Sequence, residues 1–230
     1  MPQATHSQLI SASLGILLRI GLVGLAFGML WLDLAVFQTE ILEISFTEIA
    51  QETMLFLCAV LFWTAPGATS ERGFKILAGG FFACLLMREL DGLFDPISHS
   101  AWCWPFCAIA MVSIWKAFKP GNGKNSFEAL AAFTSTPMFG SLATGLGVLI
   151  FSRIFGTGAL WHIILEDGYA RLAKTAAEEG IELLTYSMWL AAGIEYFLAQ
   201  RSAFAKPSTI NDLNAEASYS NQHRQASQHR

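Results

Sequence analysis

Charged residues are scarce in this chain, and their scarcity argues against an ordinary soluble domain. Asp, Glu, Lys and Arg make up 14% of its 230 residues, against about 25% in soluble domains, whereas 53% of the residues are hydrophobic. Mean hydropathy is +0.45. Several separate runs of about 20 apolar residues leave no segment that could build a second core. The composition therefore predicts one all-α domain, a polytopic bundle of transmembrane helices.

Clustered basic residues and paired cysteines are also missing. The formal net charge is -4 and Lys and Arg stand singly between apolar runs, so no nucleic-acid partner is expected. The four cysteines, at positions 58, 84, 103 and 107, include no C-x-x-C pair, which argues against zinc or dithiol chemistry. They are expected to act as small buried hydrophobic residues.

Several catalytic and cofactor motifs are absent as well. The chain has no G-x-S-x-G or H-E-x-x-H sequence, and it lacks the Glu-x-x-His pair of di-iron bundles. No histidine lies within a predicted span where it could bind haem iron, so haem is not expected. A nucleotide cofactor is not expected either. The segment MPQATHSQLI lacks the basic region of a signal peptide, and Leu9 onward is expected to stay in the mature chain.

Six transmembrane spans are predicted from the apolar runs. They cover approximately Leu9–Trp31, Thr47–Thr64, Phe74–Asp95, Ala101–Phe118, Phe127–Phe155 and Thr175–Gln200. Residues 33–47 should lead into the second span without a break, Pro137 should kink the fifth, and residues 156–174 should include a short interfacial helix. The predicted domains are a six-helix transmembrane domain at 1–200 and a disordered, polar cytoplasmic tail at 201–230.

The first span contains small residues and one cation. Gly21, Gly24 and Gly28 are spaced as in a face that packs closely against a neighbouring helix. Arg19 lies too near the middle of the span to reach water easily. We therefore expect it to face a carboxylate or a wet cavity inside the bundle.

The distribution of basic residues predicts the orientation. Nine lie on the side of the N-terminus: Arg72, Lys75, Lys116, Lys119, Lys124, Arg201, Lys206, Arg224 and Arg230. The other side holds only Arg153, Arg171 and Lys174. By the positive-inside rule, both termini are expected in the cytoplasm.

Acidic residues gather toward the outer side of this arrangement. Thirteen of the 18 fall there: Asp33, Glu40, Glu43, Glu48, Glu52, Glu89, Asp91, Asp95, Glu166, Asp167, Glu178, Glu179 and Glu182. His99 and His162 belong to the same side. A charge at the centre of a spanning helix costs roughly 2.5–3.5 kcal/mol, so carboxylates inside spans need water, partners or protons.

Four of these glutamates are predicted to form an intramembrane site. Glu178 and Glu182 are four residues apart on one helical face, and the second, third and sixth spans bring Glu52 and Glu89 to the same depth. Facing carboxylates suit a divalent cation, which prefers oxygen ligands. We predict a divalent-metal site with these four as ligands. Further charged residues are expected around them: Arg19, Arg88, Asp91, Asp95, Glu48 and Glu179.

Other interpretations of the carboxylates stay open. Arg88 could pair with Asp91 and Asp95 on its own helix, leaving nothing to bind a metal. Crowded acids in a membrane can also carry protons, as in a proton- or cation-coupled transporter, although Glu195 alone lies toward the inner end of a span. A membrane-embedded metal-dependent hydrolase would use metal-bound water or a carboxylate base.

Three short segments carry a resemblance. They are Arg88-Glu89-x-Asp91-x-x-x-Asp95, the run Phe151–Gly156, and Glu178-Glu179-Gly180-x-Glu182-Leu183-x-x-Tyr186. Together they resemble a group of small, uncharacterised bacterial inner-membrane proteins. The resemblance covers the third to sixth spans. It implies a multi-pass inner-membrane location and transfers no catalytic role, because no activity is assigned to that group.

Overall fold

The described part of the chain is entirely helical. The structure is a computed structural model and describes residues 2–39, 41, 44–119, 123–165 and 171–205. No strand occurs among them, which confirms the predicted all-α class. The helices are α1 Pro2–Trp31, η1 Leu32–Phe37, α2 Phe46–Thr64, η2 Thr69–Glu71, α3 Arg72–Glu89, α4 Asp91–Phe94, α5 Cys103–Ala117, α6 Gly123–Thr134, α7 Pro137–Phe155, α8 Gly158–Leu165 and α9 Arg171–Ala205.

Three helical segments are long and apolar enough to cross a membrane. They are Gln8–Phe37, Phe46–Thr64 and Pro137–Phe155. The helix Cys103–Ala117 is apolar but shorter. Large hydrophobic side chains such as Leu17, Phe27 and Ile163 are more than half exposed on the outside of the bundle, as suits lipid contact.

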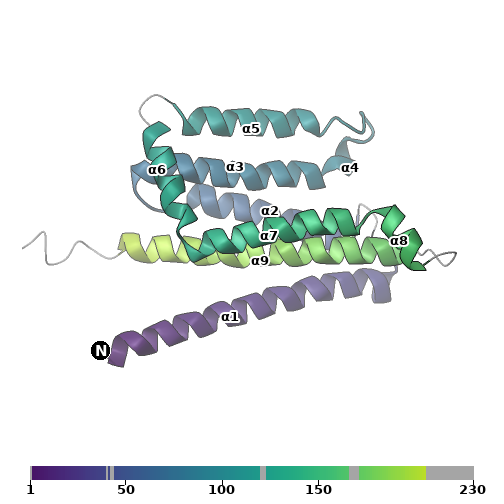
Figure 1. The fold of residues 1–230 in the computed structure, drawn as a ribbon, viewed down its shortest axis with the longest axis horizontal. Helices are drawn as coiled ribbons and strands as arrows, with labels where there is room; N and C mark the ends of the chain where they lie inside the picture. The colour runs from purple at the N-terminus through teal and green to yellow at the C-terminus, as the bar shows by residue number, and fades with distance from the viewer. Residues whose placement is uncertain (1, 40, 42–43, 120–122, 166–170, 206–230) are drawn as a thin grey trace, which may run out of the picture.

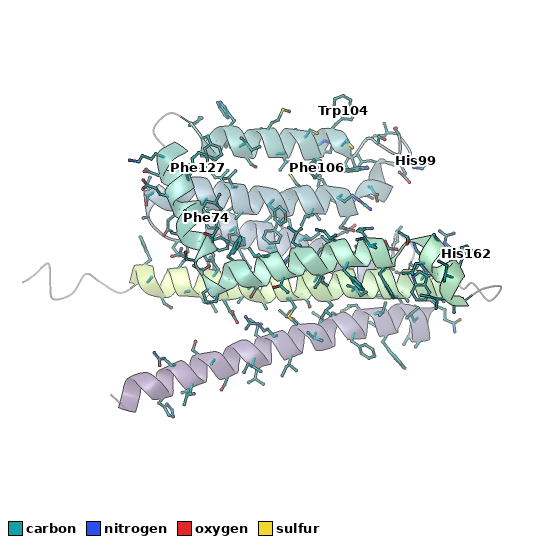
Figure 2. All side chains as sticks on the ribbon, in the orientation of Figure 1. Phe74, His99, Trp104, Phe106, Phe127 and His162 are labelled. Atoms are coloured by element: carbon teal, nitrogen blue, oxygen red, sulfur yellow. The ribbon has the colours of Figure 1, made fainter. Side chains whose placement is uncertain are left out.

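The long helices lie roughly along one direction, and successive ones reverse it (Figure 1). Helix α9 packs against α1, α2 and α7, while α3 packs against α2 and α5. The start of α1 and the end of α9 lie at one end of the bundle, called here the terminal end. The opposite end, with α4 and α8, is called the α4/α8 end. His99 and His162 both lie at the α4/α8 end (Figure 2), on the side where the sequence predicts the acids.

An aromatic core joins α2, α3 and α9. The Phe62 ring lies 5.6 Å from that of Phe82 and 5.0 Å from that of Tyr196, measured between centroids. Trp189 is fully buried beside Phe82, and its Nε1 donates to the Leu142 carbonyl on α7 at 3.2 Å. These contacts fix the rotation of α9 about its axis, and so fix which of its acidic residues face inward.

The predicted continuous entry into the second span is wrong. Helix η1 ends at Phe37, and Gln38 and Ile41 take positive φ values of 52° and 53° before Ser45 caps α2. The fully buried Asp33 holds this break together. Its two oxygens accept bonds from Thr39 Oγ1 at 2.8 Å, Phe46 N at 3.0 Å, and Thr47 N and Oγ1 at 2.7 Å each. A carboxylate with four donors replaces the helical bonds that the break removes.

The predicted fifth span is two helices rather than one kinked helix. Thr136, before Pro137, has extended backbone angles of φ -90° and ψ 150°, and its hydroxyl accepts from Phe139 N at 3.3 Å. The residue before a proline is disfavoured in the α region, so the chain breaks there and restarts with Pro137 in the first turn of α7. Helix α6 then lies across the terminal end (Figure 1), with Gly73 of α3 in contact with Ser126.

The expected packing face on α1 faces open space. A Cβ added to Gly21, Gly24 or Gly28 would meet no other atom within 4 Å. Close approach occurs instead at Gly15, beside Arg19 and Glu195, and at Gly145, beside Trp189. At the other end of the chain, α9 continues through residues 201–205, which the sequence assigns to the tail, and the rest of the predicted tail, 206–230, lies outside the described part.

Candidate functional site

Three helices, α3, α7 and α9, bring charged residues together at the α4/α8 end. Glu89 ends α3, Arg153 lies in the last turn of α7, and Glu178 and Glu182 lie one turn apart in the first half of α9. Arg153, which the sequence places among the outer basic residues, is at the centre of this group. Together with Lys174, these residues are called the Arg153 cluster.

The Arg153 guanidinium contacts three of the four predicted metal ligands. Its Nη2 lies 2.7 Å from Glu182 Oε2 and 3.5 Å from Glu89 Oε1, and its Nη1 lies 3.3 Å from Glu178 Oε1. The side chain of Glu182 is fully buried, and those of Glu89 and Glu178 are 7% and 12% exposed. The planar guanidinium can donate hydrogen bonds to several carboxylates at once. Without such a cation, a buried ionised carboxylate would strongly destabilise the fold.

Neutral and cationic donors complete the bonding of these carboxylates. Tyr186 donates its hydroxyl to Glu89 Oε1 at 2.8 Å, and Ser152 donates to Glu182 Oε1 at 3.3 Å and to the Glu178 carbonyl at 3.0 Å. Lys174 Nζ lies 2.9 Å from Glu178 Oε2 on the same helix. Ser152 and Tyr186 are themselves fully buried, so the cluster is fixed by ordered groups.

A glycine lets α7 approach the cluster closely. The nearest atoms to a Cβ added at Gly156 are those of the Glu178 carboxylate, and the overlap would force a shift. The Gly156 backbone has an ordinary φ of -73°, so the lack of a side chain matters here for space. The motif Phe151–Gly156 thus supplies the cation Arg153, the donor Ser152 and the room for Glu178.

Glu179 contacts α2 through the side chain of Gln51. Gln51 Nε2 donates to its carboxylate at 3.0 Å and to its backbone carbonyl at 3.1 Å. Gln51 is fully buried, and its Oε1 has no hydrogen-bond partner among the described residues. That oxygen is an acceptor beside a group of carboxylates, where a protonated acid or a cation could satisfy it.

Glu48 and Glu52, in the first half of α2, lie close enough to the other acids to repel them. Glu48 interacts electrostatically with Glu52, Glu89, Glu179 and Glu182. Glu52 interacts in the same way with Glu89. Neither side chain has a hydrogen bond or ion pair among the described residues, so neither is balanced by a fixed cation.

The whole group contains more negative than positive charge. Six carboxylates interact here, those of Glu48, Glu52, Glu89, Glu178, Glu179 and Glu182, against the two cations Arg153 and Lys174. Fully ionised, it would hold four uncompensated negative charges. Repulsion of that size at the edge of a low-dielectric bundle calls for bound protons or cations.

The other residues predicted around the site have partners elsewhere. Arg88 Nη1 bonds to Asp91 Oδ2 at 2.8 Å, and its guanidinium lies over Trp102, 5.9 Å from the ring centroid. Asp95 pairs with the exposed His99 at 3.0 Å. The alternative pairing of Arg88 with Asp91 therefore occurs, although Asp91 begins α4 rather than lying on the same helix as Arg88. The predicted role of Arg88, Asp91 and Asp95 around the glutamates has no direct contact to support it among the described residues.

Arg19 does find a carboxylate, as its position in the span indicates, but a different one. It forms a two-bond pair with Glu195 of α9, in which Nη2 donates to Oε2 at 2.8 Å and Nη1 contacts Oε1. It also donates to the Gly15 carbonyl at 3.1 Å. Glu195 lies about four turns from Glu182 along α9, so Arg19 does not serve the Arg153 cluster.

Metal binding at these glutamates stays a prediction. Among the described residues, no group of three or more His, Cys, Asp or Glu side chains is arranged to hold a metal ion. The Arg153 guanidinium contacts Glu89, Glu178 and Glu182, so a metal ion bound by these three would have to displace it. Of the other predicted acids, Glu40, Glu43, Glu166 and Asp167 lie outside the described residues.

No protein-family model, curated protein or solved structure matches this chain.

Proposed function

We propose that this chain is a six-span bacterial inner-membrane protein with both termini in the cytoplasm, and that its outer carboxylates carry protons or cations for transport. The six spans are α1, α2, α3, α5, α7 and α9, which alternate in direction (Figure 1). Three have the length and apolarity of spans. Arg72 and Lys75 at the start of α3, Lys116 at the end of α5 and Lys124 on α6 lie at the terminal end, which supports the proposed orientation.

One observation carries the proposal of proton or cation binding. Six carboxylates interact around two cations, and Arg153 is shared by three of them. A purely structural ion pair needs one carboxylate for each cation, as at Arg19 and Glu195. The surplus is compensated most simply by mobile positive charge, and crowded acids that gain and lose protons are how transporters couple gradients.

The central position of Arg153 favours this proposal over a metal-binding site. A divalent metal held by Glu89, Glu178 and Glu182 would have to displace a guanidinium that already contacts all three. Glu48 and Glu52, which lack a fixed cation, are the positions where a proton or cation is most needed. The divalent-metal prediction is therefore kept as an alternative outcome of the test, in which the metal content is measured.

The test is proton flux in liposomes. Purified protein is reconstituted with a pH-sensitive dye inside, gradients of Na⁺, K⁺ or Mg²⁺ are imposed, and internal pH is followed. We expect cation-dependent proton movement that Glu48→Gln and Glu182→Gln abolish, since each removes one exchangeable charge. Asp95→Asn is the matched control, a carboxylate at the same end that pairs with exposed His99. It should keep full flux.

Two other outcomes contradict the proposal. The first is that the purified protein shows no flux and contains stoichiometric divalent metal, which is lost in Glu52→Gln, Glu89→Gln and Glu178→Gln. That result would support the metal site instead. If there is neither flux nor metal and the variants are only less stable, the carboxylates are structural partners of Arg153. Reporter fusions test the topology separately, because one in the α5–α6 loop that reports outside reverses the orientation.

A further inference from the structure

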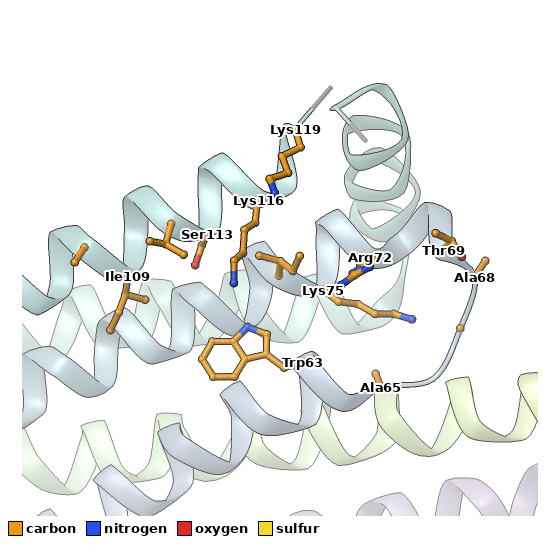
Figure 3. Close-up of a pocket in the computed structure, with 14 residues that line it drawn as sticks. Trp63, Ala65, Ala68, Thr69, Arg72, Lys75, Ile109, Ser113, Lys116 and Lys119 are labelled. Carbon is orange, nitrogen blue, oxygen red and sulfur yellow. The ribbon is translucent and has the colours of Figure 1, made fainter. Parts of the chain in front are cut away.

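A large pocket opens at the terminal end of the bundle, far from the Arg153 cluster. It lies between the end of α2, the start of α3 and the second half of α5, and has a volume of about 970 Å³. Figure 3 shows its lining, with Trp63 of α2 below and Lys116 of α5 reaching toward it. The proposed transport role does not involve any of the residues that line this pocket.

The walls of the pocket are mostly apolar and reach the outer surface of the bundle. Trp63, Ile76, Ile109 and Val112 line it. Trp63 and Val112 are 48% and 47% exposed, so the pocket continues onto the surface that α2 and α5 present to their surroundings. An indole at the end of a spanning helix is typical of the membrane interface. This shape admits a ligand with a long apolar part.

Four cations surround the polar side of the same pocket. They are Arg72, Lys75, Lys116 and Lys119. Lys75 is held by the Pro66 carbonyl at 2.8 Å and by Glu71 at 3.0 Å, and the Lys119 ammonium lies 4.2 Å from the Trp115 ring centroid. One carboxylate, Glu71, thus balances one of the four.

Arg72 and Lys116 are the two cations available to a ligand. Both are exposed, and neither has a hydrogen bond or ion pair to another described residue. They lie on neighbouring helices, α3 and α5, with Trp63 on α2 completing the pocket (Figure 3). Two free cations above apolar walls are complementary to an anion attached to an apolar chain.

We propose that this pocket binds one anionic phospholipid. The phosphate contacts Arg72 and Lys116, and an acyl chain lies along Trp63, Ile109 and Val112. The charge complementarity excludes a zwitterionic lipid as the preferred ligand, since its ammonium would be repelled by the same cations. The apolar lining excludes free phosphate, which would gain nothing from Trp63 or Ile109.

The experiment uses the full chain in a nonionic detergent. It is titrated with phosphatidylglycerol carrying brominated acyl chains, and quenching of tryptophan fluorescence is measured. We expect saturable quenching, the saturable part of which disappears in Trp63→Phe. Arg72→Gln and Lys116→Gln should each raise the half-saturating concentration about fivefold, as expected for one basic residue near a lipid phosphate.

Lys124→Gln is the matched control for charge. Lys124 lies on α6 at the same end, is 90% exposed, and pairs weakly with Glu128 at 3.9 Å rather than lining the pocket. It should leave the half-saturating concentration unchanged. If Trp63→Phe lowers the melting temperature, native mass spectrometry of the Arg72→Gln and Lys116→Gln variants with unbrominated phosphatidylglycerol provides the same comparison.

Three results overturn the proposal. Equal quenching by brominated phosphatidylcholine would mean that Trp63 contacts lipid without selecting its charge. Displacement of phosphatidylglycerol by millimolar inorganic phosphate would assign the pocket to a free anion. An equal effect of all three charge removals, Lys124→Gln included, would assign the selectivity to the net charge of this end of the protein.

Discussion

Replacing Arg153 with Met tests whether the guanidinium compensates the buried carboxylates. Methionine keeps much of the apolar stem but removes the charge bonded to Glu89, Glu178 and Glu182. Removing one partner of a buried ion pair costs about 3–5 kcal/mol. Because the Arg153 side chain is 38% exposed and partly solvated, we expect the lower end, about 3 kcal/mol.

The assay is thermal unfolding in detergent, followed at several pH values. For a chain of this size, about 3 kcal/mol corresponds to a fall of roughly 6–12 °C in melting temperature. The loss should be largest at neutral pH, where the carboxylates left without Arg153 are charged. It should shrink in acid, because protonation removes the charge that lacks a partner.

A second variant separates lost charge from lost packing. Adding Glu182→Gln to Arg153→Met removes the fully buried carboxylate that the guanidinium contacts at 2.7 Å. The double variant should therefore be more stable than Arg153→Met alone. Arg171→Met, an exposed position at the start of α9, is the control and should change little. An equal loss at all pH values, not restored by Glu182→Gln, would refute the electrostatic reasoning.

Two further substitutions test the local geometry. Asp33→Asn should destabilise the protein by at least about 2 kcal/mol in the same unfolding assay, because one amide oxygen cannot replace a carboxylate that accepts four hydrogen bonds. Asp95→Asn, whose carboxylate pairs with the exposed His99, should be nearly neutral. Gly156→Ala should destabilise the protein and abolish proton flux, because the added Cβ would overlap the Glu178 carboxylate. Gly147→Ala is the control, since its added Cβ meets open space, and it should be neutral or slightly stabilising. Equal behaviour of the two variants would contradict the packing described at Gly156.

The sequence predicted the helices better than their junctions. Apolar runs and proline positions placed both ends of α2 and α5 to within two residues, since these signals are local, and placed the other long helices less closely. The break after Phe37 depends on a carboxylate, Asp33, that accepts bonds from residues up to 14 positions away. No periodicity reveals such a bond. Pro137 was recognised as a disturbance, but whether it kinks or ends a helix depends on the extended backbone at Thr136.

The sequence predicted which glutamates lie at the same level of the bundle, but not which cations they pair with. Glu89, Glu178 and Glu182 do lie together, because alternate helix directions put them at one level. Their partner was missed, because Arg153 was counted among loop residues by the positive-inside rule. One signal could have found it: Gly156 ends α7, so Arg153 is within the last helical turn. The pairing of Arg19 with Glu195 could not be predicted, because it depends on the rotation of α9 about its axis, which the aromatic core fixes.

Acidic residues without a bonded cation allow a structural role to be distinguished from a role in transport. Arg19 and Glu195 form a balanced pair, whereas Glu48 has no hydrogen bond or ion pair among the described residues and is repelled by Glu52, Glu89, Glu179 and Glu182. A carboxylate that serves only the fold should stabilise it. One that serves transport can persist at a cost in stability.

Glu48→Gln should therefore stabilise the protein by about 1 kcal/mol at neutral pH while it abolishes proton flux. The substitution keeps the shape of the side chain and removes one of the carboxylates that are in excess over Arg153 and Lys174. Unfolding temperature and liposome flux are measured on the same preparation, with Glu195→Gln as the control that should lose stability and keep flux, since its carboxylate is balanced by Arg19. A destabilised Glu48→Gln variant with normal flux would show that Glu48 is a structural group, because only a stabilising contact can be lost in that way.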